Sequence, residues 1–201
     1  MLHWQVNYYP VLSSTQTFLK SQAESFPEGT CIIAHQQSEG VGRKGDPWQS
    51  QSGGLYASFI LKPQQLVNEL PLVLLRAIYE TLNELSLPSL QVKWPNDILI
   101  QGKKVSGLLI DSQILGSNPL YYICGFGVNI NQQHFSQELE ACSLLQVTSK
   151  PQSIYRVLVQ ILHHFQQFYE QYQLNKSGFC QESVSLLPWL EYNEHIEKWK
   201  D

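Results

Sequence analysis

The distribution of apolar and polar residues along the chain predicts a domain that combines strands with helices. Residues 3–11 and 55–61 alternate in character, which is typical of strands with one buried face. Residues 30–35 form a short apolar run that indicates a buried strand, and residues 120–131 predict a further strand followed by a loop. We therefore expect a sheet whose strands come from segments spread over most of the chain.

Three other segments carry helical signals. Residues 70–85 and 153–172 place apolar side chains three and four positions apart, so each predicts an amphipathic helix packed on the core. We interpret His163 and His164, beside the second stripe, as solvent or boundary residues rather than ligands. Residues 13–16 have the S-x-x-Q form of a capping box, which predicts a helix over about residues 14–25.

The most distinctive stretch is residues 92–111. Two apolar runs, 98–100 and 105–110, flank the dipeptide Gln101-Gly102, and this arrangement predicts antiparallel strands joined by a tight turn. Pro95 cannot donate a backbone hydrogen bond, so the first of these strands should begin after it. The stretch therefore forms a hairpin with a polar corner at its mouth.

Charged and polar side chains surround that corner. Asn96 and Asp97 lie at the mouth of the hairpin, where exposure of a polar group costs little. Lys104 begins the returning strand, and it serves either as an edge charge that prevents aggregation or as a cation that faces an anionic ligand. Asp97 either orients an incoming group or caps the corner, and the residues alone do not choose between these roles.

A long polar segment, residues 36–54, separates two of the predicted strands. It contains five glycines and no apolar period, and a loop of this length in a compact domain is usually functional or disordered. Glycines allow backbone N–H groups to close around a phosphate, with Arg43 as a planar multi-donor cation. We expect this loop to order over a ligand. Trp48 would then either pack over the bound molecule or pin the loop to the core.

Composition narrows the class of protein. The chain has 201 residues, 43% of them hydrophobic, which suits one folded domain, and its net charge of −4 with no basic run argues against nucleic acid as a partner. The four cysteines lack metal-site spacing, so we interpret them as reduced core thiols. A signal-peptide pattern and an apolar run of membrane-spanning length are both absent, which predicts a cytoplasmic protein with no membrane contact.

Four motifs in order resemble the signature of biotin protein ligases. They are KWPND at residues 93–97 followed by Lys104-Val105-Ser106-Gly107, the loop pattern QxxGxGRxGxxW at 37–48, Ser14-Thr15 before a helix, and GFGVNIN at 125–131 after a strand. The resemblance covers roughly residues 10–135. It implies an α/β (α+β) catalytic domain with a mixed, mostly antiparallel sheet and helices mainly on one side, related to class II tRNA synthetases.

The same resemblance sets the expected limits of the domain. We expect the catalytic domain to occupy residues 1–185. Residues 186–201 resemble the start of the family's small C-terminal β-barrel, which this protein either lacks or continues beyond the given sequence. The DNA-binding domain of repressor-type members is not expected, because the catalytic part begins by about residue 10.

The resemblance implies a set of site residues. Those expected to contact biotin are Ser14, Thr15, Gln37, Gly40, Lys104 and Gly107. Those expected to contact ATP or the adenylate are Gly42, Arg43, Lys44, Trp48, Lys93, Asn96 and Asn129. Three of these residues also have a purely structural interpretation. Ser14 and Thr15 would cap a helix, and Asn129 would be a loop asparagine that bonds its own backbone.

The implied chemistry has two steps. The biotin carboxylate attacks the α-phosphate of ATP to give biotinyl-5′-AMP, and a lysine of a biotin carboxyl carrier domain then takes the biotin. Arg43, Lys104 and Asp97 are the candidate catalytic residues, because two anions must meet in a field of fixed positive charge. Mg²⁺ would enter with the ATP phosphates, and no protein ligand is assigned to it.

Some positions leave alternatives open. Val41 and Asp46 stand where many family members carry basic residues, and Gln36 competes with Gln37 for the role of the biotin-contacting glutamine. A lipoate ligase-like acyltransferase and a non-catalytic biotin-binding module are the rival functions. The sequence also leaves open whether the protein forms a homodimer.

Overall fold

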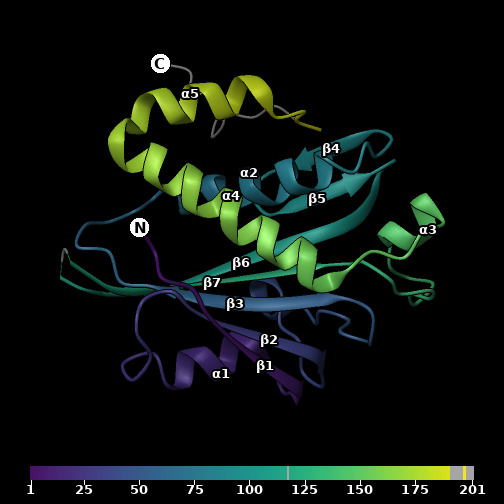
Figure 1. Ribbon diagram of the computed structural model, residues 1–201, viewed down its shortest axis with the longest axis horizontal. Coiled ribbons are helices and arrows are strands. Elements are labelled where there is room, and N and C mark those ends of the chain that lie inside the picture. Colours follow the sequence, from purple (N-terminus) through teal and green to yellow (C-terminus); the bar gives the residue numbers. More distant parts are fainter. Residues whose placement is uncertain (117, 191–196, 198–201) are drawn as a thin grey trace.

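The computed structural model of the chain describes residues 1–116, 118–190 and 197. One seven-stranded sheet, in the order β1-β2-β3-β7-β6-β5-β4, runs through it (Figure 1). The strands are β1 (Gln5–Leu12), β2 (Thr30–Gln37), β3 (Leu55–Leu61), β4 (Leu90–Lys93), β5 (Asp97–Ile100), β6 (Lys103–Leu115) and β7 (Asn118–Val128). The helices are α1 (Thr15–Ser21), α2 (Leu70–Asn83), α3 (Leu144–Thr148), α4 (Ile154–Leu174) and α5 (Lys176–Leu186), with a short 3₁₀ turn at Arg43–Gly45.

The strand directions follow from the connections. β1 and β2 are parallel, because α1 connects them along the chain and returns it to the end of the sheet where β1 begins. The other neighbouring pairs are antiparallel. The expectation of a mixed, mostly antiparallel sheet is therefore confirmed.

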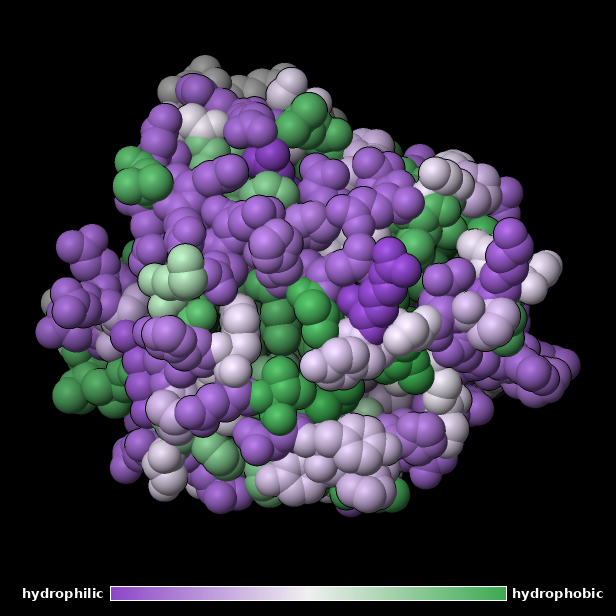
Figure 2. Space-filling view, viewed as in Figure 1, coloured by the Kyte–Doolittle hydropathy of each residue, from purple (hydrophilic) through white to green (hydrophobic). Residues whose placement is uncertain are grey.

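Helices cover both faces of the sheet, but unequally. α2, α4 and α5 lie over one face, where the main core forms around Phe59, Phe165 and Phe126 (Figure 1). α1 alone packs on the opposite face, through Leu19 onto a small cluster. In the view of Figure 2, the surface over α4 and α5 is mostly hydrophilic, and a group of hydrophobic residues lies below them, near the centre of the view. The short α1 leaves part of the second sheet face uncovered.

The predicted hairpin is confirmed. Gln101 and Gly102 have φ values of 51° and 78°, and two positive φ values in a two-residue loop are those of a type I′ turn. β5 begins at Asp97, after Pro95 as expected, and β6 continues to Leu115, five residues beyond the predicted end. The extension pairs with β7 and makes these two strands the longest of the sheet.

The first helix differs from the prediction. Ser14, not Ser13, is its N-cap residue and accepts a hydrogen bond from the backbone N–H of Thr17, and the helix ends at Ser21 rather than near residue 25. Gln16 does not return to the cap as a capping box requires. Its amide is 5% exposed and points into the sheet, where buried acceptors compete for it. Tertiary hydrogen bonds have overridden the local motif.

Three elements were not predicted from the sequence, and the burial of one predicted strand was wrong. β4 and α3 are four and five residues long, and α5 has little apolar periodicity. β3 is buried along its whole length rather than on one face, because helices lie on both sides of it. Short or evenly buried elements carry no periodic signal to detect.

The C-terminal segment is only partly described. Residue 186 ends α5, and Trp189 then pairs with Val92 on the β4 edge of the sheet. The expected start of a β-barrel at residues 186–201 lies mostly outside the described residues, since 191–196 and 198–201 are among those not described.

All four thiols should be unreactive in the folded protein. Cys31, Cys124, Cys142 and Cys180 are buried and form no disulfide, as predicted. Burial raises the pKa of the Cys31 thiol to about 12 and those of Cys142 and Cys180 to about 11, so almost no thiolate exists at pH 8. We expect a chromogenic disulfide reagent at pH 8 to titrate none of them quickly in buffer and four in denaturant. Rapid native labelling would contradict this burial.

Candidate functional site

A hollow lies on the sheet face that α1 only partly covers. Side chains alternate along each strand, so Ser58 of β3, Gly107 of β6, and Gly125 and Gly127 of β7 all face this side. Gly107 and Gly127 are direct cross-strand partners. Because these four residues are small, the sheet forms a low floor there while large apolar side chains fill the opposite face.

The hollow is a cleft of about 450 Å³. Its walls come from the N-terminus of α1, the end of β2, the glycine-rich loop after β2, and the hairpin β5–β6. Predicted site residues that line it are Ser14, Thr15, Gln37, Gly42, Arg43, Trp48, Asn96, Lys104 and Gly107. Segments separated by more than ninety positions therefore meet in one pocket.

Gln37 rather than Gln36 belongs to the cleft. The Gln37 side-chain carbonyl accepts a hydrogen bond from the backbone N–H of Thr15 at 2.8 Å, and its amide nitrogen donates to Ser50 Oγ at 2.8 Å. Gln36 instead donates to Ser52 Oγ outside the cleft. Strand alternation places only one of two adjacent glutamines inward, and the one that lines the cleft is Gln37.

The glycine-rich loop has a defined shape. Val41 pairs with Pro47 across it, and the Gly42 N–H donates to the Asp46 carbonyl at 2.7 Å. A Cβ on Gly40 would lie 2.5 Å from the Trp48 carbonyl, so only glycine fits there. Gly40 thus shapes the loop from behind the cleft wall and does not line the cleft.

Arg43 connects the loop to the hairpin corner. Its guanidinium donates to Asn96 Oδ1 at 2.8 Å, although the two residues are 53 positions apart. Arg43 is otherwise exposed, so several of its donor N–H groups face the solvent-filled mouth of the cleft. This arrangement leaves a planar cation available to an anion at the mouth.

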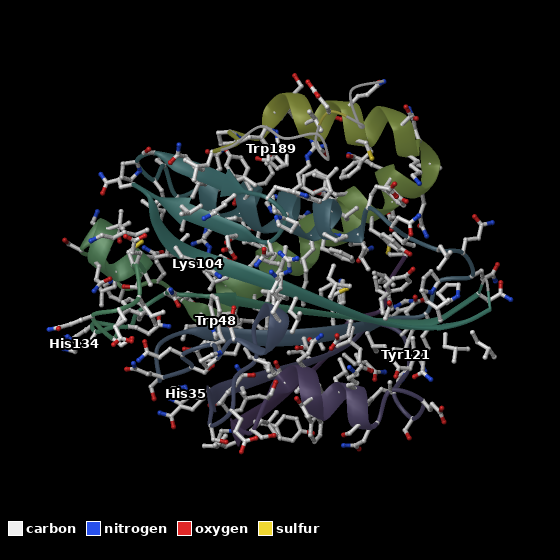
Figure 3. All side chains as sticks on the ribbon, turned by 180° about the vertical axis from the view of Figure 1, so that it is seen from behind. His35, Trp48, Lys104, Tyr121, His134 and Trp189 are labelled. Atoms are coloured by element: carbon white, nitrogen blue, oxygen red, sulfur yellow. The ribbon has the colours of Figure 1, made fainter. Side chains whose placement is uncertain are left out.

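Lys104 is the second cation of the site. Its ammonium lies 2.7 Å from Asp97 Oδ1, and the side chains are 33% and 21% exposed. The ammonium also lies 5.0 Å from the centre of the Trp48 ring, within cation–π range. Figure 3, which shows the molecule from behind relative to Figure 1, shows Trp48 and Lys104 near one another at one end of the sheet.

A second cavity adjoins the first and shares part of its lining. Arg43, Trp48, Asn96 and Lys104 line both, and Lys44 and Asp97 line the second alone. Three cations and the carboxylates of Asp46 and Asp97 therefore surround one opening. Its wall suits a ligand with several negative charges.

Trp48 rests on the glycine floor. A Cβ on Gly127 would lie 2.6 Å from the indole ring, and one on Gly107 would lie 2.9 Å from it. The indole Nε1 is buried without a hydrogen-bond partner among the described residues. The floor thus accommodates a flat aromatic ring above two backbone strands, and Trp48 both lines the cleft and pins the loop.

Besides Gly40, two more of the expected contact residues line neither cavity. Asn129 is 4% exposed; its amide donates to the Lys104 carbonyl at 3.3 Å and accepts from Gln132, so it supports the Lys104 backbone from behind. The Lys93 side chain is exposed and lines neither cavity, while its carbonyl accepts the Asn96 N–H at the corner. The spacing of the motifs did not indicate that Asn129 and Lys93 lie away from the cavities.

Several lining residues were not among the expected site residues, namely Gln16, Val41, Tyr56, Ser58, Gly125 and Gly127. The glycines had a sequence signal, since they permit close backbone approach. Tyr56 had none; burial raises the pKa of its phenol to about 12, and the hydroxyl donates to the Gln51 carbonyl. Tyr56 is therefore a neutral wall residue at ordinary pH.

The described residues contain no cluster of three or more His, Cys, Asp or Glu side chains that could hold a metal ion. Across that same part of the chain, no helix is long and apolar enough to span a membrane.

Substitution of the two adjacent glutamines should separate their roles. We expect Gln37→Ala to weaken ligand binding in the cleft about 10-fold, because it removes hydrogen bonds that hold Thr15 and Ser50. The matched variant Gln36→Ala should stay within about 2-fold of the wild type. Isothermal titration with the cleft ligand measures both, and equal losses would contradict the assignment.

Comparison with known proteins places these features in a family. Residues 8–129 match the sequence profile of the Biotin/lipoate A/B protein ligase family. This match includes most of the cleft-lining segments described above.

Individual relatives agree with that match. The chain is 37% identical over 194 residues to the Bifunctional ligase/repressor BirA of Bacillus subtilis, covering 92% of this chain and 58% of that protein. The chain thus spans little more than half of that relative. A solved structure titled biotin protein ligase from Aquifex aeolicus in complex with biotin and ATP superposes with a TM-score of 0.79, at 33% identity, covering 91% of this chain and 78% of that one.

Proposed function

The chain belongs to the biotin/lipoate A/B protein ligase family, and we propose that it is an ATP-dependent biotin protein ligase. It forms biotinyl-5′-AMP and transfers the biotin to a lysine of a biotin carboxyl carrier domain. The observation that supports this most directly is the convergence of Arg43 and Lys104, from the glycine-rich loop and from β6, on one cleft. The Aquifex aeolicus relative, named for the same activity, supports the choice of substrate.

Substrate binding divides between the two ends of the cleft. Ser14, Thr15 and Gln37 form the inner end, where a neutral ring with N–H and carbonyl groups finds partners. The cationic mouth with Arg43 and Lys104 takes the biotin carboxylate and the ATP phosphates. This places the two reacting anions beside fixed positive charge.

The first step joins the two substrates. A carboxylate oxygen of biotin attacks the α-phosphorus of ATP, the bond to the bridging oxygen breaks, and pyrophosphate leaves. Negative charge builds on the phosphoryl oxygens during this step, and Lys104 and Arg43 stabilise it by charge and hydrogen bonding. Mg²⁺ would be held mainly by the phosphates, as suits a site without a protein metal cluster.

The second step transfers the biotinyl group. The amine of the acceptor lysine attacks the acyl carbon, a proton leaves the nitrogen, and AMP departs with the bonding electrons. Asp97 lies at the cleft mouth within an ion pair to Lys104, so it is placed to orient a cationic lysine or accept its proton. The mixed anhydride reacts with water, and the loop over the cleft limits access to it.

A lipoate ligase is the alternative within the family. The KWPND corner and the polar inner end of the cleft favour a ring with hydrogen-bonding groups over the dithiolane of lipoate. A non-catalytic biotin-binding module is the alternative of a different class. It would use Thr15 and Gln37 but would not need Arg43 and Lys104 beside one another.

One experiment separates the three. Purified protein is incubated with ATP, Mg²⁺ and labelled biotin plus a biotin carboxyl carrier domain, or in a parallel reaction with labelled lipoate plus a lipoate acceptor domain, and label on the acceptor lysine is measured by mass spectrometry. We expect biotin transfer, and none when the acceptor lysine is replaced by arginine. Transfer of lipoate instead, or biotin binding with no transfer, would contradict the proposal.

A further inference from the structure

A buried hydrogen-bond network connects the glycine-rich loop to the strand that carries Lys104. Gln132 lies at its centre, and its amide nitrogen donates to the Tyr56 hydroxyl at 3.0 Å and to Asn129 Oδ1 at 3.3 Å. On the loop side, Tyr56 donates to the Gln51 carbonyl at 2.6 Å. On the strand side, the Asn129 amide donates to the Lys104 carbonyl at 3.3 Å. The side chains of the network are at most 4% exposed.

The direction of every bond in this network is set by backbone groups. The carbonyls at its two ends can only accept, so Tyr56 and Asn129 must each turn a donor towards them. The Ile130 N–H can only donate, and it lies 2.7 Å from Gln132 Oε1. The Gln132 nitrogen therefore faces the oxygens of Tyr56 and Asn129, and both of its protons have an acceptor. A reversed amide would leave these buried groups without partners.

Packing around Gln132 also leaves the amide no room to move. A Cβ on Gly54 would lie 2.5 Å from the Gln132 nitrogen and would overlap the Tyr56 hydroxyl, so the Gly54 backbone closes the network on that side. Ser143 Oγ donates to the Gln132 carbonyl at 2.7 Å and holds the backbone in place. The network is therefore a rigid connection between its two ends.

The two ends belong to the two cationic segments of the site. Arg43 lies on the loop whose far end is held at Gln51, and Lys104 is held through its own carbonyl. Segment 140–142 also holds the Lys104 backbone, and the network adds a connection from there to the loop. A fixed cation stabilises developing negative charge only when it is correctly placed, so the relative position of these segments affects the rate.

We propose that Gln132 is a positioning residue for adenylate formation, which holds Lys104 in place through Asn129 and the glycine-rich loop in place through Tyr56. The inference rests on the proposed function, because adenylate formation is the step in which both cations act. Gln132 lines neither cavity of the site and acts only through its partners. Its loss should slow this step and leave biotin affinity unchanged, since separate hydrogen bonds hold the inner end of the cleft.

The test uses Gln132→Met, which keeps the length of the side chain and removes its amide. Single-turnover pyrophosphate release with biotin, ATP and Mg²⁺ gives the rate, and isothermal titration gives the biotin affinity. We expect the rate to fall about 10-fold while the biotin affinity stays within about 2-fold of the wild type. Gln133→Met makes the same change at the adjacent, exposed position and should leave both quantities within about 2-fold.

Two further variants examine the route of the effect. Tyr56→Phe keeps the ring but disconnects the loop, so it should lower the rate about 5-fold, and it serves as the test if Gln132→Met does not fold. Gln132→Met combined with Lys104→Ala should lose less than the sum of the single losses, because little remains to be positioned once the ammonium group is gone.

Three results would overturn the inference. They are a normal rate in folded Gln132→Met or, failing that variant, in Tyr56→Phe; equal losses of rate and of biotin affinity, which indicate general damage; and fully additive losses in the double variant. Biotin binding by the wild type without any release of pyrophosphate would instead overturn the proposed function.

Discussion

Lys104→Ala should lower the rate of biotinyl-5′-AMP formation by about 30-fold or more, which is about 2 kcal/mol of transition-state stabilisation. The lysine supplies a fixed positive charge where negative charge develops on the phosphoryl group. Its backbone is held independently by segment 140–142 and by Asn129, so the strand should keep its place when the side chain is removed. Pyrophosphate release in single-turnover conditions measures the effect.

Lys103 provides the matched control. It is the preceding residue on the same strand, its side chain is exposed, and strand alternation points it away from the cleft. Lys103→Ala should therefore remain within about 2-fold of the wild type. If Lys104→Ala formed adenylate at a nearly normal rate, Lys104 would have no part in the mechanism.

Gly127→Ala should lower kcat/KM for ATP by about 10- to 100-fold. Its Cβ would lie 2.6–2.7 Å from three atoms of the Trp48 indole, and overpacking of this kind costs about 1–3 kcal/mol. The ring would have to leave the glycine floor, and it would then move into the mouth of the cleft beside Lys104. The backbone at Gly127 is extended within β7, so the alanine itself adds no strain there.

A double-mutant cycle separates loss of the ring's position from general damage to the strand. In a Trp48→Ala background the new methyl group meets empty space, so Gly127→Ala should have little further effect. Fully additive losses in the double variant would mean that Gly127 acts through the strand and not through Trp48.

The elements predicted best were those with strong local signals. The hairpin around Gln101-Gly102 depends on two turn residues that accept positive φ and on an apolar run on each side of the turn. This local pattern was sufficient to predict the hairpin. The long amphipathic helices α2 and α4 were found for the same reason. The short elements β4 and α3, and the non-amphipathic α5, were missed, because too few turns or alternations exist to establish a period.

The sequence motifs indicated which residues line the cleft better than they indicated how the side chains are arranged. Arg43, Lys104 and Gln37, which belong to separate motifs, all line the cleft. Gln16 has the appearance of a capping residue in sequence, and only its acceptors on β6 and β7, Asp111 and the Ile123 carbonyl, explain where its amide goes. The position of Asn129 behind Lys104 likewise depends on Gln132, a partner that no motif includes.

The most direct test of a single cleft that joins a carboxylate to a nucleotide needs no acceptor protein. The protein is mixed with biotin, ATP, Mg²⁺ and labelled pyrophosphate, and incorporation of the label into ATP is measured. We expect exchange that requires biotin and is lost in Lys104→Ala but retained in Lys103→Ala. Tight biotin binding without any exchange would contradict it.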